Sequence, residues 1–351
     1  MERRKIEGWM IKLVTIFMIL TIGLGLATGP AKTSAAETAE QFYRGKTLTW
    51  VTAGGAGSSQ DLLGRLLAPF LAQEIGAEVK VENMGSNKGP NYVYKQAKPN
   101  GLTLLVRDTN ALIMNAVLKA PGLQYDLEKF NYIADVLPQK MLFGVSPKLP
   151  YRTLDELCKA KGLKAGGTSA RGGLVVTSAV MLEVLGLDGK VITGYKGRKR
   201  LSIALAQGEV DIISGTTATA AYLDEKAGDA VYLFVIGNER SPIFPNLPAF
   251  EEIWQKIPKV AANPYELISL GSGRAILTTP GVPEERVAYL RKIFDRLNKS
   301  KEVQAKIMNF AQARPEFIPG EKLQARITNI AKKKTLTDEL QSILNKYLVT
   351  K

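Results

Sequence analysis

Residues 47–71, TLTWVTAGGAGSSQDLLGRLLAPFL, constrain the fold of this chain more than any other stretch. A β-branched and aromatic run over residues 47–52 precedes a glycine-rich stretch over residues 53–57, and leucine and phenylalanine then repeat at helical spacing. Ser58 and Asp61 are spaced like a capping box at the start of that helix. The pattern predicts a strand, a glycine loop and a helix, in that order.

Such a loop can bind an anion, because it leaves backbone N–H groups at the positive end of a helix dipole. Gly54, Gly55 and Gly57 do not give the GxGxxG spacing of dinucleotide sites, and no Gly-Lys-Ser/Thr follows as in phosphate loops. Taken alone, this loop is therefore either a site for a small anion or a tight turn without a ligand.

Further strands are expected over residues 77–81 and 102–106, with helical segments between them. Asp108 and Thr109 follow the second of these strands, where they could cap the next helix or meet a ligand. The alternation predicts an α/β fold with mostly parallel sheets, in which ligands bind at loops that leave the carboxyl ends of strands.

A second glycine loop, GGTSARGG, lies between a short apolar run and the helix expected over residues 174–185. Thr168, Ser169, Arg171 and Gly172 place hydroxyls, a guanidinium and backbone amides at a helix start, which suits a carboxylate. A capped turn with a solvated arginine is the alternative. Two such loops that face each other across a cleft would indicate a binding site more strongly than either loop alone.

Composition excludes several classes of function. The 351-residue chain is 45% hydrophobic, which is enough for a sizeable core, and its formal net charge of +14 suits anionic ligands or surfaces. It contains no histidine, so neither an imidazole-based catalytic triad nor a histidine-ligated metal centre can form. The single cysteine, Cys158, rules out a disulfide within the chain and is expected to be a buried apolar residue on a helix over residues 151–161.

The N-terminus has the three parts of a secretory signal. Residues 1–12 are basic, residues 13–27 are apolar, and small residues near Ala35 and Ala36 suit cleavage. The apolar run is shorter than the roughly twenty residues that span a bilayer, so an uncleaved anchor is the weaker reading. We expect residues 1–36 to be a signal peptide and the protein to act in the periplasm or another extracytoplasmic space.

Several segments in order resemble the substrate-binding proteins of tripartite tricarboxylate transporters, also called the Bug family. They are FYRGKTLTWVTAGGAGSSQDLLGRLLAPFL, VKVENMGSNKGPNYVYKQAKPNGLTLL, YDLEKFNYIADVL, VITGYKG, GEVDIISG, RSPIFPNLPAFEEI and LTTPGVPEERVAYLRKIF. The resemblance implies a two-lobed periplasmic binding protein fold, the Venus flytrap, in which each lobe is a mostly parallel sheet flanked by helices. It implies capture of a small organic anion, typically a carboxylate, and delivery to a membrane permease without catalysis, cofactor or metal.

The resemblance also suggests boundaries. We expect the first lobe over residues 37–143, the second over 144–241, and a return to the first lobe with the C-terminal helices over 242–351, with two chain crossings as the hinge. The residues expected to contact the ligand are Gly54, Gly55, Ala56, Gly57, Ser58, Ser59, Asp61, Asp108, Thr109, Thr168, Ser169, Arg171, Gly172, Tyr195, Lys196, Gly197, Thr216 and Thr217.

Other local expectations can be tested. Arg198, Lys199 and Arg200 crowd a helix start and are expected to project into water. The GSGR segment at residues 271–274 is expected to form a bulge or a close backbone approach in a strand. We expect a monomer that binds no nucleic acid, since no nucleic-acid-binding motif accompanies the basic residues. A ligand-sensing subunit for a membrane signalling receptor is the alternative function.

Overall fold

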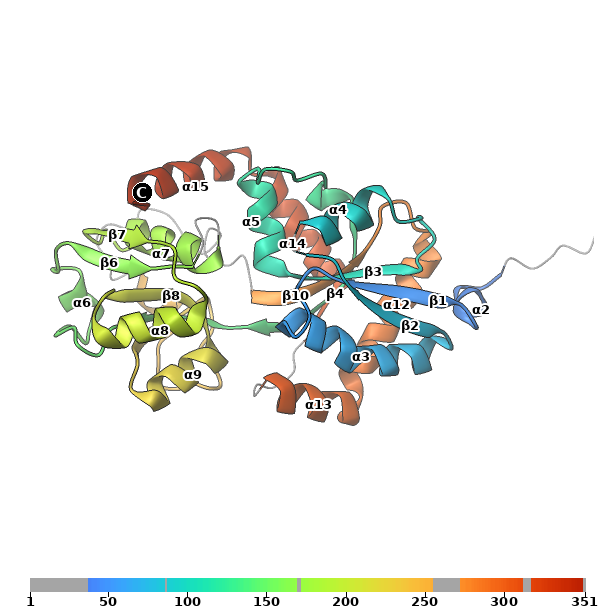
Figure 1. The fold of residues 1–351 in the computed structure, drawn as a ribbon, viewed down its shortest axis with the longest axis horizontal. Coiled ribbons are helices and arrows are strands. Elements are labelled where there is room, and N and C mark those ends of the chain that lie inside the picture. The colour runs from blue at the N-terminus through green and yellow to red at the C-terminus, as the bar shows by residue number, and fades with distance from the viewer. Residues whose placement is uncertain (1–36, 86, 169–171, 255–271, 312–316, 350–351) are drawn as a thin grey trace, which may run out of the picture. The chain divides into compact units, whose positions relative to one another are not determined.

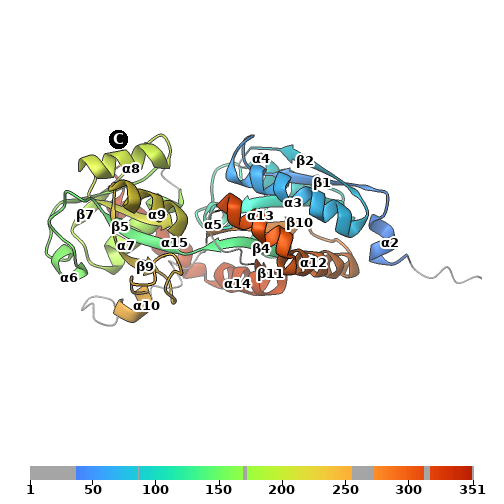
Figure 2. The same cartoon turned by 90° about the horizontal axis from the view of Figure 1, so that it is seen from below.

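The computed structural model describes residues 37–349 apart from residue 86 and the segments 169–171, 255–271 and 312–316, so the expected signal peptide lies outside the described residues. The chain divides into residues 1–38 and 39–351, and the following account concerns the second unit. It contains two β-sheets, each flanked by helices (Figures 1 and 2). The prediction of a two-lobed α/β fold is confirmed.

The first lobe is built on a six-stranded sheet of order β11-β4-β10-β3-β1-β2. Its strands are β1 (Thr47–Thr52), β2 (Glu78–Asn83), β3 (Thr103–Asp108), β4 (Asn131–Gln139), β10 (Ser272–Thr278) and β11 (Phe317–Pro319). Side chains alternate between the two faces, so that Leu104 and Val106 enter one core and Leu105 enters the other. Trp50 packs edge-on against Phe294 in the first of these cores, with ring centroids 6.0 Å apart.

Helices cover both faces of this sheet (Figure 1). On one face lie α2 (Ala39–Tyr43), α3 (Ser59–Ile75), α12 (Glu284–Lys299) and α13 (Lys301–Ala311), and on the other α4 (Lys88–Lys95), α5 (Thr109–Val117) and α14 (Gly320–Lys332). The predicted unit at residues 47–71 is confirmed. Leu63, Leu67 and Leu71 of α3 are fully buried at helical spacing, and Gly76 ends the helix in the left-handed conformation with φ of 62°.

The second lobe has a five-stranded sheet of order β7-β6-β8-β5-β9. Its strands are β5 (Met141–Val145), β6 (Leu163–Gly166), β7 (Gly189–Ile192), β8 (Ile212–Thr217) and β9 (Val231–Ile236). Its helices are α6 (Leu154–Leu157), α7 (Gly173–Val184), α8 (Arg198–Gln207), α9 (Ala218–Ala227) and α10 (Phe250–Ile253). Apolar residues of α8 and α9 cover one face of the sheet, and α7 covers the other.

Both sheets are mixed, where mostly parallel sheets were expected. In the first lobe β1 runs parallel to β2 and β3, but β10 is antiparallel to β3 and β4. In the second lobe β6 is parallel to β7 and β8, but β5 is antiparallel to β8 and β9. In each sheet an antiparallel strand follows a crossing of the chain between the lobes, β5 after the first crossing and β10 after the second.

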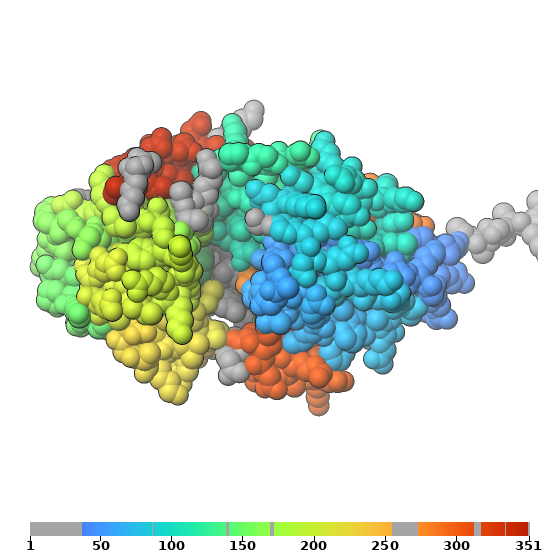
Figure 3. Space-filling view, in the orientation of Figure 1, coloured from blue at the N-terminus to red at the C-terminus, as the bar shows by residue number. Residues whose placement is uncertain are grey.

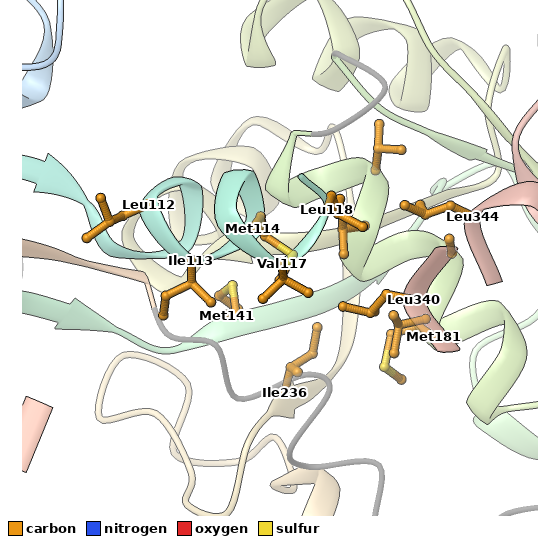
Figure 4. Close-up of a cluster of buried hydrophobic side chains, with 14 of the residues drawn as sticks. Leu112, Ile113, Met114, Val117, Leu118, Met141, Met181, Ile236, Leu340 and Leu344 are labelled. Carbon is orange, nitrogen blue, oxygen red and sulfur yellow. The ribbon is translucent and has the colours of Figure 1, made fainter. Parts of the chain in front are cut away.

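The last helix, α15 (Lys334–Tyr347), packs on α7 of the second lobe and adds a connection to the two expected crossings. Figure 4 shows Leu340 and Leu344 of α15 in one cluster with Met181 of α7 and Val117 of α5. The Lys346 ammonium lies 2.5 Å from the Glu183 carboxylate, and Leu348 pairs with β7. One hydrophobic core therefore includes side chains from both lobes.

Two local expectations in the second lobe are wrong. Cys158 is exposed, because α6 is a single turn that ends before it, and its thiol makes a weak hydrogen bond to the Leu185 carbonyl. Arg198 does not project into water. Its guanidinium forms an ion pair of 2.7 Å with the buried carboxylate of Asp224 on α9.

Candidate functional site

The loop between β1 and α3 is held by side chains at its own helix start. Ser58 is the N-cap of α3, and its hydroxyl accepts a hydrogen bond from the Asp61 amide at 3.3 Å. A Cβ on Gly54 would lie 2.2 Å from the Ser58 hydroxyl oxygen, so only glycine fits there. Gly55, Ala56 and Gly57 are exposed, and the backbone amides of Gly55 and Ala56 are open to a ligand.

Asp61 fixes the shape of this loop from behind. Its carboxylate accepts hydrogen bonds from the Gly57 amide at 2.8 Å, the Asn83 side-chain amide at 2.9 Å and Arg65 Nε at 2.9 Å. Desolvation would raise the pKa of Asp61, but the hydrogen bonds from Gly57 and Asn83 and the charge of Arg65 together hold it below its ordinary value. The acceptor atoms of Asp61 are thus already used within the loop.

Replacing Asp61 by alanine should lower the free energy of unfolding by about 1–3 kcal/mol, because the Gly57 and Asn83 donors lose their acceptor. Asp61→Asn keeps one acceptor oxygen and should lose less. Urea denaturation measures both changes, with exposed Glu82→Ala as the matched control. Equal stability of Asp61→Ala and the control would show that the loop does not depend on this carboxylate.

Arg274 of β10 joins the end of β3 to the start of α3. Its Nη1 donates to Asp108 Oδ2 at 2.8 Å, and its Nη2 donates to the Ser59 hydroxyl at 3.0 Å. The other carboxylate oxygen of Asp108 accepts a hydrogen bond from the Ala111 amide at 2.8 Å. Asp108 therefore also caps α5, which is one of the two roles predicted for it. Ser59 accepts from Arg274 and retains its own O–H donor.

A bulge places Arg274 there. The register of β10 against β4 shifts between Ser272 and Arg274, and a Cβ on Gly273 would lie 1.8 Å from the carboxylate of Asp135. The predicted bulge or close approach in the GSGR segment is confirmed. Arg274 is not among the residues predicted to contact the ligand, although a basic residue next to a bulge in an apolar strand was the available signal.

Asp135 lies against Gly273, next to Arg274 in the sequence of β10. It is 1% exposed, and its Oδ1 accepts a hydrogen bond from the Thr109 hydroxyl at 2.9 Å. Burial raises the pKa of Asp135 to about 7, against the opposing effects of the Thr109 hydrogen bond and of Arg326. Thr109 is itself 1% exposed, so its hydroxyl faces the interior of the first lobe and not solvent.

The second lobe contributes the junction between β8 and α9. Thr217 is the N-cap residue of α9, and its side chain makes no capping hydrogen bond. Thr219, in the first turn, has a buried hydroxyl oxygen without a partner among the described residues. Thr216 is 1% exposed and points into the lobe.

The remaining predicted residues of the second lobe lie on three other helix starts or strand ends. Thr168 is partly buried after β6, Gly172 is the N-cap residue of α7, and Gly197 begins α8 with φ of 86°. The Tyr195 hydroxyl donates to Glu209 at 2.9 Å within the lobe, and Lys196 is exposed. Ser169 and Arg171 lie outside the described residues.

A cavity of about 360 Å³ unites residues from both sheets. Its polar lining comprises Ser59, Arg274, Thr217 and Thr219, and its apolar lining comprises Leu62, Leu63, Leu137, Ala220, Leu223, Phe310 and Ala311. Figure 3 shows the surface hollowed between α9, in yellow, and α3 and α13, in blue and orange-red. Ser59 and Thr217 are the predicted residues that line it, and Asp108 contacts it through Arg274.

Two other hollows, of about 370 and 550 Å³, are less suited to a ligand that closes the lobes. One lies between α12 and β11, and the other between the end of α5 and the junction of α14 with α15. Neither is lined by residues of the second sheet or its connections up to α10. Only a ligand that contacts both lobes can favour their closed arrangement, so the cavity at Arg274 is the candidate site.

The described part of the chain contains no group of three or more cysteine or acidic side chains placed to hold a metal ion. Within the same residues, no helix has both the length and the apolar character needed to cross a bilayer.

Two sheets with a cavity that residues of both line are the arrangement of the solute-binding proteins. Residues 63–269 match a family described as "Tripartite tricarboxylate transporter family receptor". The chain belongs to this family, as its sequence motifs predicted. A receptor of this kind binds its ligand without converting it.

Known relatives agree with this assignment. The chain is 24% identical to Protein BugT from Bordetella pertussis over 298 residues, which cover 82% of this chain and 86% of BugT. A TctC solute-binding protein from Polaromonas has the same fold, with a TM-score of 0.70 and 19% identity over 86% of this chain and 98% of its own. MatC from Rhodopseudomonas palustris, solved with bound malate, has a TM-score of 0.59 and 19% identity over 85% of this chain and 99% of its own.

Proposed function

We propose that this protein is an extracytoplasmic receptor that captures a small organic anion, a carboxylate, between its lobes and delivers it to the membrane permease of a tripartite tricarboxylate-type transporter. One observation carries the proposal: a single cavity brings together the Arg274 guanidinium, the first turn of α3 and the first turn of α9. The family description supports the permease as partner, and the signal-like residues 1–36 support the location.

The physical basis is charge complementarity from both lobes. The N-termini of α3 and α9 carry partial positive charge and backbone N–H donors, and α3 and α9 belong to different lobes. Arg274, which is paired with Asp108, adds planar guanidinium donors that suit a carboxylate. An anion that contacts both helix starts stabilises the closed arrangement of the lobes more than the open one.

The predicted glycine loops are additional ligand contacts in this proposal and not the main ones. Gly54, Gly55 and Ala56 would offer backbone amides on closure, as would the segments at Thr168, Gly172 and residues 195–197, because the amides of Ala53, Gly57 and Ser58 already donate within the protein. MatC with malate and a second Rhodopseudomonas palustris protein with adipate show that proteins of this fold hold carboxylates. The protein is proposed to act as a monomer.

Opposite effects of two substitutions test the proposal. Thermal shift and calorimetry at low salt measure the binding of hexanoate, adipate, malate and citrate. Hexanamide and adipamide are the neutral controls. A bound acid at one hundred times its dissociation constant should add about 2.7 kcal/mol of stability. Arg274→Gln should weaken binding about 10- to 100-fold, because charge-assisted hydrogen bonds are lost.

Asp108→Asn should strengthen binding of the same acid, because it removes the carboxylate that now engages Arg274 while an asparagine still caps α5. Arg44→Gln, at an exposed ion pair with Glu40, is the matched control and should change nothing. Amides that bind as well as the acids, or an affinity that Arg274→Gln leaves intact, would refute the proposed anion receptor.

A further inference from the structure

We infer that the ligand carries one carboxylate on an apolar body, so that the receptor selects aliphatic or aromatic monocarboxylic acids over di- and tricarboxylic acids. The inference rests on the proposed function and refines it. Its basis is the unequal division of the cavity into one cationic corner and an extended apolar wall.

The cationic corner can neutralise one negative charge. Arg274 is the single charged residue in the described lining of the cavity, and it is already paired with Asp108 at 2.8 Å. Of the donors on its guanidinium, Nη1 serves Asp108 and the Gly273 carbonyl, and one Nη2 hydrogen serves Ser59. Once the first carboxylate occupies Arg274 and the two helix starts, a second carboxylate of the ligand would lie against leucine and phenylalanine, where an unpaired charge is strongly disfavoured.

The apolar wall comes from both lobes. Leu62 on α3 and Leu223 on α9 are 45% and 58% exposed, although large apolar side chains in a monomer are normally covered. Both line the cavity, together with Phe310 of α13. An apolar ligand body between Leu62 and Leu223 would cover the two side chains at once and so favour closure.

The backbone conformation of Leu137 supports an apolar wall that the fold holds in place. This residue lies in β4 just before the crossing to β5, has φ of 58°, is 5% exposed and lines the cavity. Left-handed backbone is disfavoured for a residue with a branched side chain and persists where the surroundings enforce it, commonly at ligand sites. This position places a leucine, and not a polar residue, in the lining beside Arg274, which pairs with the preceding residue Val136.

The volume of the cavity limits the size of the body. At about 30 Å³ for each water-sized group, 360 Å³ accommodates roughly a dozen non-hydrogen atoms. Carboxylic acids with six to nine carbon atoms are of this size.

Paired acids of equal carbon number test the inference by calorimetry on the full chain. Hexanoate is compared with adipate, and 4-methylbenzoate with terephthalate. Butanoate, pentanoate and hexanoate give the effect of chain length. We expect hexanoate to bind at least tenfold more tightly than adipate. Each added methylene should improve the affinity about fourfold.

Leu223→Ser should reduce the gain per methylene to less than twofold, while Tyr222→Ser, at a neighbouring residue that is 47% exposed and does not line the cavity, should leave it unchanged. Both positions are exposed, so neither substitution should impair folding. If adipate, malate or citrate binds more tightly than hexanoate, or the methylene gain survives Leu223→Ser, the inference is wrong and the proposed anion receptor stands. If no carboxylate binds, both fail.

Discussion

Replacing Asp224 by alanine should lower the free energy of unfolding by about 3–5 kcal/mol, because it leaves the charge of Arg198 unpaired in a partly buried site. The Asp224 carboxylate accepts hydrogen bonds from Arg198 Nη1 at 2.7 Å and Nη2 at 3.0 Å, from the Ser202 hydroxyl at 3.0 Å and from the Tyr232 hydroxyl at 2.9 Å. Burial and the Asp224 charge raise the pKa of Tyr232, so its hydroxyl stays a donor.

The network connects α8, α9 and β9, and Arg198 Nη2 also donates to the Ala220 carbonyl in the first turn of α9 at 2.9 Å, so its loss also bears on the candidate site. Urea denaturation compares Asp224→Ala with Glu225→Ala, its exposed neighbour on the same helix. The double variant Arg198→Met with Asp224→Ala should recover part of the loss, since no unpaired charge remains. A loss below 1 kcal/mol for Asp224→Ala would mean that the network does not stabilise the second lobe.

Local chemistry in the sequence was enough to predict the strand, loop and helix unit at residues 47–75. Its signals are short-range: β-branched residues, glycines, an N-cap serine and a four-residue leucine repeat. The bulge at Gly273 followed from the same kind of argument, because glycine in a strand indicates close backbone approach. Fold class and family were likewise accessible from ordered motifs.

Contacts between residues distant in the sequence could not be predicted from it. Arg198 pairs with Asp224 across 26 residues, and Arg274 reaches Asp108 and Ser59 across 166 and 215 residues. Spacing along the chain carries no information about such contacts, so Arg198 was interpreted as solvated and Arg274 was missed. The mixed sheets have the same cause, since strand direction depends on where the chain crosses between lobes.

The same distant packing gives the first lobe a carboxyl group, Asp135, that titrates near neutral pH. Its Oδ2 is buried without a hydrogen-bond partner among the described residues, and Gly273 allows the carboxyl group to lie against the β10 backbone. Desolvation raises its pKa from 3.8 to about 7; the Thr109 hydrogen bond and the charges of Arg326 and Arg274 oppose this rise, and the charge of Asp108 adds to it. The folded protein therefore retains a proton that the unfolded chain has already released.

Asp135 should make the protein less stable as pH rises from about 4 to about 7. Its contribution is complete below the unfolded pKa of about 3.9, disappears as pH passes the folded pKa, and is constant above it. A rise of about three pKa units corresponds to at most about 4 kcal/mol. Asp135→Asn cannot ionise, so it should match the wild type near pH 4 and exceed its stability at pH 8.

The measurement is urea denaturation of wild type and Asp135→Asn at several pH values, with their difference plotted against pH. Other carboxylates titrate in both proteins and cancel in that difference, so its slope isolates Asp135. The difference should grow with pH until about 7 and then level off. A flat difference would mean that Asp135 ionises at its ordinary pKa and that the packing against Gly273 opens to water in solution, which would also loosen the bulge that positions Arg274 in the cavity.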